Sequence, residues 1–203
     1  MPARWRETQP AVDQLVIQRR IERCGANQLG LITHRQLLWA GLSAQAISKR
    51  ARSERLHPTC RRGVYSLHPP PLSAAQSLNA AVLSLGPDAV ASDFSAAFHT
   101  GLADDPPRCH HLTVPPAGGR AARRGIAVHR RLIDPRDRIS FAGVLCTTPH
   151  RTLVDLAPTE SEQTLEMIMV AAASEGLLNR SRLIELVVRG TLALRSTLTG
   201  EQR

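Results

Sequence analysis

A run of three prolines, Pro69-Pro70-Pro71, constrains this chain more than any other feature. Proline has a fixed φ and no backbone N–H, so a run of three cannot continue a helix or enter the middle of a sheet, and it forms a stiff extended spacer. The 203 residues are enough for two small domains. The run therefore predicts a domain over residues 1–70, a second domain over 72–190 and a polar tail over 191–203.

The two predicted domains differ sharply in charge. Residues 1–70 hold 12 Lys and Arg against 4 Asp and Glu, an excess of +8, whereas residues 71–203 hold 14 against 13. Nearly all of the formal net charge of +9 therefore lies in the first third of the chain. Positive charge concentrated in one module is the electrostatic footprint of a nucleic-acid-binding domain. We expect the first domain to contact a polyanion.

The first domain reads as three helices followed by a basic hairpin. Thr33 and Ser43 are good helix N-caps, and Gly41-Leu42-Ser43 forms a three-residue turn. Leu37 and Leu38 are expected to face inward. The expected elements are helices over residues 12–24, 34–40 and 43–53 and strands over 56–58 and 61–67. This order is typical of a winged helix-turn-helix, which places one helix in the major groove of DNA.

Beyond the prolines the pattern predicts a small mixed domain, so the fold class of the whole chain is α+β. The expected elements are helices over residues 73–85, 93–100, 148–157, 160–175 and 181–188 and strands over 111–114, 125–130 and 143–147. Thr148 caps one helix, Pro149 opens it, and Arg151 and Asp155 form an i, i+4 pair on it, which indicates an architectural role. The core residues expected on that helix are Leu153, Val154, Leu156 and Ala157.

On a helical wheel the third helix separates into an apolar face and a polar face. Ile47 points inward, whereas Gln45, Lys49 and Arg52 gather on the other side with Ser48 at the edge. Gln and Arg contact base edges and Lys contacts phosphates, so this face predicts a DNA-reading surface; the alternative is a merely solvated face. The candidate DNA-binding residues are Thr33, Arg35, Ser43, Gln45, Ser48, Lys49, Arg52, Arg61 and Arg62.

A second group of arginines lies in the second domain. These residues either extend the DNA footprint or belong to a solvated loop and an exposed strand end. The group consists of Arg120, Arg123, Arg124, Arg130 and Arg131.

The sequence carries no pattern typical of catalysis, and we expect no enzyme activity, no cofactor and no metal. Acidic pairs such as Asp134 with Asp137 lie in loops rich in Pro and Arg and are expected to be solvated, and Cys109-His110-His111 lacks the spacing of a zinc site. Neither a phosphate-binding Gly-x-x-x-x-Gly-Lys-Ser/Thr loop nor a Gly-x-Ser-x-Gly elbow occurs. The single lysine, Lys49, is not in a Glu-x-Lys pair.

Composition also bears on the compartment. No apolar run approaches the roughly 18 residues of a membrane span, and the N-terminus lacks the apolar stretch of a signal peptide. The cysteines are isolated, at Cys24, Cys60, Cys109 and Cys146. We therefore expect a cytoplasmic protein with reduced thiols and no membrane partner.

Two segments resemble a known family. Gly30–Ser43, followed by Arg55-Leu-His and Arg62–Tyr65, resembles the N-terminal winged-helix domain of the AbiEi-family antitoxins, the regulators of type IV toxin–antitoxin systems. Leu112–Pro115, Arg124–Arg130 and Gly143–Ala157, which contains Thr-Thr-Pro-His-Arg-Thr-Leu-Val-Asp-Leu-Ala, resemble the second domain of the same family. Together these matches span about residues 12–188.

The resemblance implies a sequence-specific repressor that binds inverted repeats in double-stranded DNA and autoregulates its operon. DNA contact would fall to Ser43–Arg52 and to Arg61-Arg62, and the second domain would counteract a nucleotidyltransferase-type toxin. Many relatives continue into an endonuclease domain that resembles very-short-patch repair nucleases, whereas this chain ends at Arg203 as a short or truncated member. The alternatives are the DNA-targeting portion of such an endonuclease without its catalytic domain, and a ligand-responsive winged-helix regulator.

Overall fold

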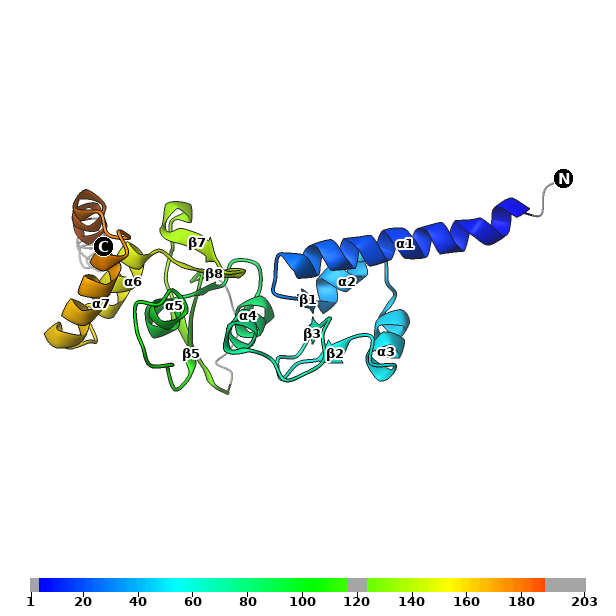
Figure 1. Cartoon of the computed structure of the whole chain (residues 1–203), viewed down its shortest axis with the longest axis horizontal. Helices are drawn as coiled ribbons and strands as arrows, with labels where there is room; N and C mark the ends of the chain where they lie inside the picture. Colours follow the sequence, from blue (N-terminus) through cyan, green and yellow to red (C-terminus); the bar gives the residue numbers. More distant parts are fainter. Residues whose placement is uncertain (1–3, 117–123, 189–203) are drawn as a thin grey trace, which may run out of the picture. The chain divides into compact units, whose positions relative to one another are not determined.

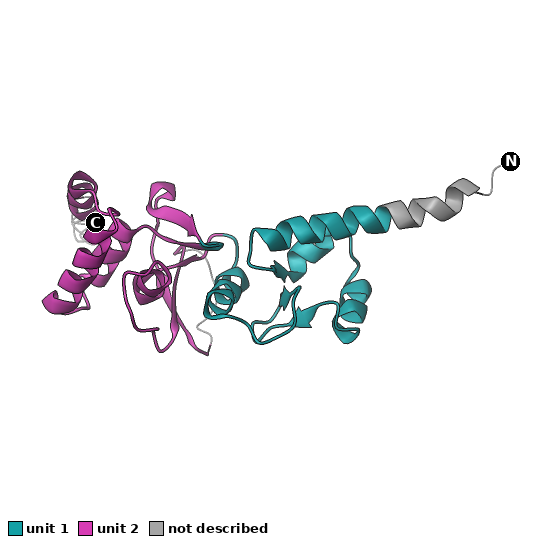
Figure 2. Cartoon of the chain, viewed as in Figure 1, with its two compact units in different colours: residues 1–87, 142–144 teal, residues 88–141, 145–203 magenta. Residues whose placement is uncertain are grey.

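The computed structural model describes residues 4–116 and 124–188, with side chains from Asp13 onward. They form two compact units (Figure 2). The N-terminal unit comprises residues up to Pro87 together with Ala142–Val144, and the C-terminal unit comprises Asp88–Phe141 with the residues from Leu145 onward. The predicted tail over 191–203, Arg120 and Arg123 lie outside the described residues.

The N-terminal unit combines four helices with a small antiparallel sheet in its described part (Figure 1). The sheet has the strand order β1-β3-β2, with Leu31 opposite Ser66 and His57 opposite the same residue on the other side. The elements are α1 (Arg4–Ala26), β1 (Leu31–Thr33), α2 (His34–Ala40), α3 (Ala44–Arg52), β2 (His57–Pro58), β3 (Val64–Ser66) and α4 (Ala74–Leu85). The structure confirms the predicted helices and hairpin, with α1 beginning eight residues earlier, and it adds β1.

Local capping chemistry fixes the two short helices. Thr33 and Gln36 form a capping box at the start of α2, and the Ser43 hydroxyl accepts a hydrogen bond from the Ala46 N–H at the start of α3. Gly41 ends α2 with a φ of 112°, a left-handed conformation that disfavours a side chain. These caps set the tight turn between α2 and α3.

A small apolar core joins the helices of this unit. Its buried members are Ile21, Ile32, Leu37, Ala40, Leu42, Ile47 and Leu56. Leu37 is buried as predicted, but the prediction for Leu38 was wrong, because its side chain is 45% exposed. Adjacent residues on a helix point about 100° apart, so a short surface helix presents only one of them to its core.

Helix α4 packs on the N-terminal unit, so the division between the units falls after Pro87 and not at the proline run. Ala80 is fully buried against Leu31 and Val64. The Asn79 side-chain amide donates a hydrogen bond of 3.0 Å to the carbonyl oxygen of Gln28. The spacer predicted at residues 69–71 therefore lies within one unit, because α4 buries its apolar face against β1 and β3.

The C-terminal unit is a mixed sheet with helices, as expected for an α+β fold. The strand order is β6-β5-β4-β8-β7, with β5 parallel to β6, β4 antiparallel to β5 and β4 parallel to β8. The elements are β4 (Val90–Ala91), α5 (Asp93–His99), β5 (His110–Val114), β6 (Ile126–Arg130), a 3-10 turn (Pro135–Asp137), β7 (Arg138–Phe141), β8 (Val144–Thr147), α6 (Pro149–Leu156), α7 (Glu162–Ser174) and a helical segment over 180–188.

The helices of this unit share an apolar core. It contains Ala97, Leu102, Leu153, Leu156, Ile168 and Ala172. Leu153 and Leu156 are buried as expected, whereas Val154 is only half-buried and Ala157 is exposed. Thr148 accepts a hydrogen bond from the Arg151 N–H and caps α6 as predicted. Across residues 4–116 and 124–188 no helix is both long and apolar enough to cross a membrane.

Candidate nucleic-acid interface

Helix α3 exposes the polar face that the wheel predicts. Ile47 is buried, whereas Gln45, Lys49 and Arg52 are exposed. Ser48 is also exposed, and its hydroxyl donates a hydrogen bond of 3.0 Å to the carbonyl oxygen of Ala44. Within the described part of the chain, Gln45 and Lys49 make no side-chain hydrogen bond or ion pair, so both can contact an external partner.

The turn between β2 and β3 is held in a fixed conformation by hydrogen bonds. The Thr59 hydroxyl donates to the Val64 carbonyl oxygen at 3.0 Å and accepts from the Arg61 N–H at 3.1 Å. Gly63 closes the turn with a φ of 80°. The turn therefore presents Arg62, which is exposed, and Arg61, which is half-buried, from a rigid base.

Helix α3 and this turn together line a hollow of about 420 Å³. Ser48 and Arg52 line it from α3, and Arg61 and Arg62 line it from the turn. Four of the candidate residues, which lie up to 14 positions apart in sequence, thus meet at one concave surface. Its lining carries three guanidinium groups and no carboxylate, an electrostatic arrangement suited to a phosphate backbone.

The remaining candidates lie at the starts of the helices and have more varied surroundings. The Thr33 hydroxyl is engaged in the capping box, where it accepts from the Gln36 N–H at 3.2 Å. The Ser43 hydroxyl caps α3 in the same way. Arg35 is exposed on the first turn of α2. Neither hydroxyl lines the hollow beside α3, and each one stabilises the N-terminus of its own helix.

Two residues that the sequence did not single out connect α2 to the basic turn. The His34 N–H donates a hydrogen bond of 2.8 Å to the Gly63 carbonyl oxygen. The His34 ring nitrogen Nδ1 lies 3.5 Å from the Tyr65 hydroxyl. These contacts place the start of α2 beside the hairpin. No sequence signal could reveal them, because they depend on the pairing of β1 with β3.

The C-terminal unit contains a buried network of carboxylates and guanidinium groups. Arg131 Nη1 lies 3.2 Å from Asp93 Oδ1 and 3.1 Å from Asp155 Oδ1. Arg151 Nη2 lies 3.0 Å from the same Asp155 oxygen, which confirms the predicted i, i+4 pair. Burial raises the pKa of Asp155, and the neighbouring Arg151 and Arg131 oppose that rise. Arg131, with a side chain that is 30% exposed, is therefore paired with two buried carboxylates of its own unit.

Asp137 corrects a second expectation, because it is buried and not solvated. Its residue exposure is 1%. Its carboxylate pairs with Arg182 from the helical segment over 180–188, and Arg151 Nη1 lies 4.0 Å away. The network thus joins the 3-10 turn, α6 and the last described helix. A Pro- and Arg-rich loop looks solvated in sequence, and only the fold shows that Asp137 pairs with the distant Arg182, whereas Asp134 pairs with Arg136 inside the loop.

Two histidines extend this network at the β5–β6 pair. The rings of His111 and His129 stack at 5.5 Å, and His129 Nε2 lies 3.6 Å from Asp93 Oδ2. Burial lowers the pKa of His111, an effect that the nearby Asp93 partly opposes. In the ranges that the structure describes, no three His, Cys, Asp or Glu side chains converge as metal ligands.

The family of AbiEi antitoxin C-terminal domains matches residues 79–193, which is more than half of the chain. The chain belongs to the AbiEi antitoxin family. The AbiEi match begins within α4 and contains the whole carboxylate–guanidinium network. Helices α1 to α3 and the hairpin lie outside the matched residues.

The comparison with solved structures gives a weak likeness. The crystal structure of the RV2827C protein from Mycobacterium tuberculosis is 17% identical, with 76% of this chain and 71% of that chain covered, at a TM-score of 0.38. No curated protein matches this AbiEi-family chain.

Proposed function

We propose that this chain is the antitoxin of a type IV toxin–antitoxin pair, and that it represses its own operon in the cytoplasm by binding inverted repeats in double-stranded DNA. Membership of the AbiEi family supports the antitoxin role. In this proposal the N-terminal unit is a winged helix-turn-helix, and the C-terminal unit counteracts a nucleotidyltransferase-type toxin without catalysis of its own.

One observation carries the DNA-binding part of the proposal. Gln45, Lys49 and Arg52 project from a capped helix seated on its own core, next to a hairpin turn that carries Arg61 and Arg62. The order helix, strand, helix, helix, strand, strand with a three-stranded antiparallel sheet supports the winged assignment. Helix α3 would enter the major groove, and the turn would contact flanking phosphates or the minor groove.

Each side chain then has a separate task. Gln45 and Arg52 offer hydrogen bonds to base edges, since an amide pairs with adenine and a guanidinium with guanine. Lys49 supplies a point charge to a phosphate, which strengthens binding to every sequence. The exposed Arg35 and Arg62 would add phosphate contacts at the two sides of the helix.

A mobility-shift titration on the chain's own upstream DNA and on scrambled DNA, at two salt concentrations, tests these tasks. Lys49→Ala is expected to weaken binding to both DNAs and to lower the slope of log K against log salt by about 0.9. Gln45→Ala is expected to reduce discrimination between the two by about 1–3 kcal/mol. Arg23→Ala, an exposed arginine on the last turn of α1, is the matched control. Equal losses on both DNAs for Gln45→Ala would contradict its assigned task.

Co-expression with the neighbouring toxin gene tests the antitoxin part separately. Because the AbiEi match leaves α3 outside, Lys49→Ala is expected to preserve rescue of growth while it reduces repression. Loss of both in a folded Lys49→Ala protein would show that the two activities are not divided in this way.

A further inference from the structure

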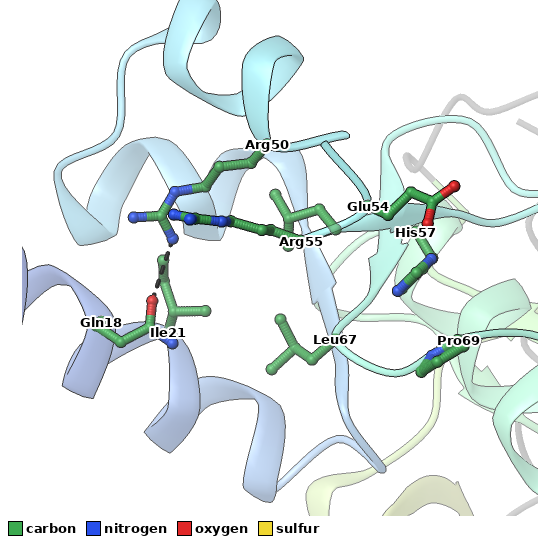
Figure 3. Close-up of a pocket in the computed structure, with 9 residues that line it drawn as sticks. Gln18, Ile21, Arg50, Glu54, Arg55, His57, Leu67 and Pro69 are labelled. Atoms are coloured by element: carbon green, nitrogen blue, oxygen red, sulfur yellow. Dashed lines mark hydrogen bonds between the residues drawn. The ribbon is translucent and has the colours of Figure 1, made fainter. Parts of the chain in front are cut away.

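A second hollow in the N-terminal unit has a volume of about 610 Å³ and lies between α1, the end of α3 and the strands that follow it (Figure 3). This size falls within the range of roughly 300–1,000 Å³ that small-molecule sites occupy. It lies apart from the DNA-facing hollow, since none of its lining residues is shared. The lining residues are Gln18, Ile21, Arg50, Glu54, Arg55, Leu56, His57, Leu67 and Pro69.

Two guanidinium groups occupy one end of this hollow. Arg50 is held in place by α1, because its Nη1 donates a hydrogen bond of 3.1 Å to Gln18 Oε1 and its Nη2 one of 3.5 Å to Gln14 Oε1. Burial lowers the pKa of Arg50, and the charge of the nearby Arg55 lowers it further. Across the described ranges neither arginine pairs with a carboxylate, and Glu54 points away from both (Figure 3).

The rest of the hollow is suited to the uncharged part of a ligand. Ile21 and Leu56 are each 1% exposed, so they form the packed base of the hollow and leave little of their own surface open to a ligand. Leu67 and Pro69 also line it, so a flat ring system can lie against carbon atoms there. Glu54 and His57 at the far end offer an acceptor and a ring nitrogen for hydroxyl or amino groups (Figure 3).

We propose that this hollow binds a small phosphomonoester whose phosphate lies between Arg50 and Arg55 and whose uncharged part covers Leu67 and Pro69. Two adjacent cations without a carboxylate partner favour a dianion, and a phosphomonoester carries nearly two negative charges at neutral pH. Guanidinium groups match phosphate oxygens with paired N–H donors. A phosphodiester of the DNA backbone carries only one charge, about half of what the two guanidinium groups can neutralise.

Isothermal titration calorimetry of the full chain with AMP tests the site, with adenosine as the probe that lacks the phosphate. We expect AMP to bind at least tenfold more tightly than adenosine. Arg55→Gln is expected to weaken AMP binding at least tenfold, because this exposed side chain supplies charge and makes no internal hydrogen bond among the described residues. Arg23→Gln, which lies outside the hollow, is expected to leave AMP binding unchanged. Arg50→Gln is expected to weaken AMP binding as well; if this variant does not fold, the comparison of Arg55→Gln with Arg23→Gln decides the result.

Three results would overturn the proposal. The first is the absence of AMP binding at millimolar concentration, and the second is equal binding of AMP and adenosine. The third is an Arg55→Gln protein that keeps AMP binding but loses affinity for a duplex oligonucleotide. That result would place Arg55 in the DNA-binding surface instead.

Discussion

Among the residues that the structure describes, Arg131 is the one arginine that contacts both Asp93 and Asp155, so its removal is a sharp test of how the C-terminal unit is held together. The change Arg131→Gln keeps a polar side chain of moderate length but leaves the two carboxylates without that charge. Asp93 and Asp155 have side-chain exposures of 6% and 4%, so water cannot replace the lost partner fully.

The expected loss follows from these contacts. Removal of one partner from a buried ion pair costs about 3–5 kcal/mol. The Arg131 side chain is 30% exposed, and Arg151 still neutralises Asp155 at 3.0 Å, so the lower end of the range applies. We expect a loss of about 3 kcal/mol in the free energy of unfolding of this unit, which for roughly 100 residues corresponds to about 12 °C in Tm.

Differential scanning calorimetry and far-ultraviolet circular dichroism of the full chain measure this loss. Both tryptophans, Trp5 and Trp39, lie in the N-terminal unit, so their fluorescence reports on that unit alone. Arg108→Gln, an exposed arginine outside the network, is the control.

A double-mutant cycle with Asp155→Asn completes the test. The variant that carries both changes should be less destabilised than the sum of the single changes, because Asn removes the charge that Arg131 neutralises. A Arg131→Gln protein within 1 kcal/mol of the unaltered chain, with no coupling to Asp155→Asn, would refute the assigned role of the network.

Three further predictions concern pH, thiol reactivity and the turn between α2 and α3. Burial lowers the pKa of His111, so the contribution of this residue to stability is complete above about pH 6.5 and is lost as the pH falls through the lowered pKa. Urea denaturation at stepped pH should therefore show a decline in the free energy of unfolding that His111→Gln reduces, and an unchanged decline would exclude His111 as its source. Burial raises the pKa of Cys146 to about 11, so at pH 8 only about one such thiol in a thousand is ionised. Ellman's reagent should therefore modify the exposed Cys60 first in the native protein, and a Cys146 that reacts as fast as Cys60 would contradict its burial. Gly41→Ala should cost about 1–2 kcal/mol in urea denaturation, because φ is 112° and the added Cβ would lie 3.1 Å from Ile17; equal stability would show that the turn relaxes.

Local features of the sequence were sufficient to predict helices α2 and α3 and the turn between them. Thr33, Gly41 and Ser43 carry the capping and turn chemistry of α2 and α3 in their own side chains and backbone preferences, so the bounds of these helices follow without knowledge of the rest of the chain. The separation of Ile47 from Lys49 on α3 likewise depends only on helix geometry.

The short strands could not be found in this way. β1 spans Leu31–Thr33 and β4 spans Val90–Ala91, too few residues for an alternating pattern to appear. Each exists because a distant strand supplies its hydrogen bonds, β3 for β1 and both β5 and β8 for β4. The same dependence explains why the sequence did not predict the hollow that Arg50 and Arg55 line, since α1 forms one of its walls.

The amino-acid sequence by itself determined the capped helices, the two faces of α3, the basic character of the first 70 residues and the i, i+4 pair of Arg151 with Asp155. Only the tertiary structure decided that Asp137 is buried, that Arg131 neutralises two carboxylates and that α4 packs against β1 and β3. The physical reason is the range of the interactions: caps and helix faces depend on neighbours within one turn, whereas burial and ion pairing depend on residues that the folded chain brings together from far apart in sequence.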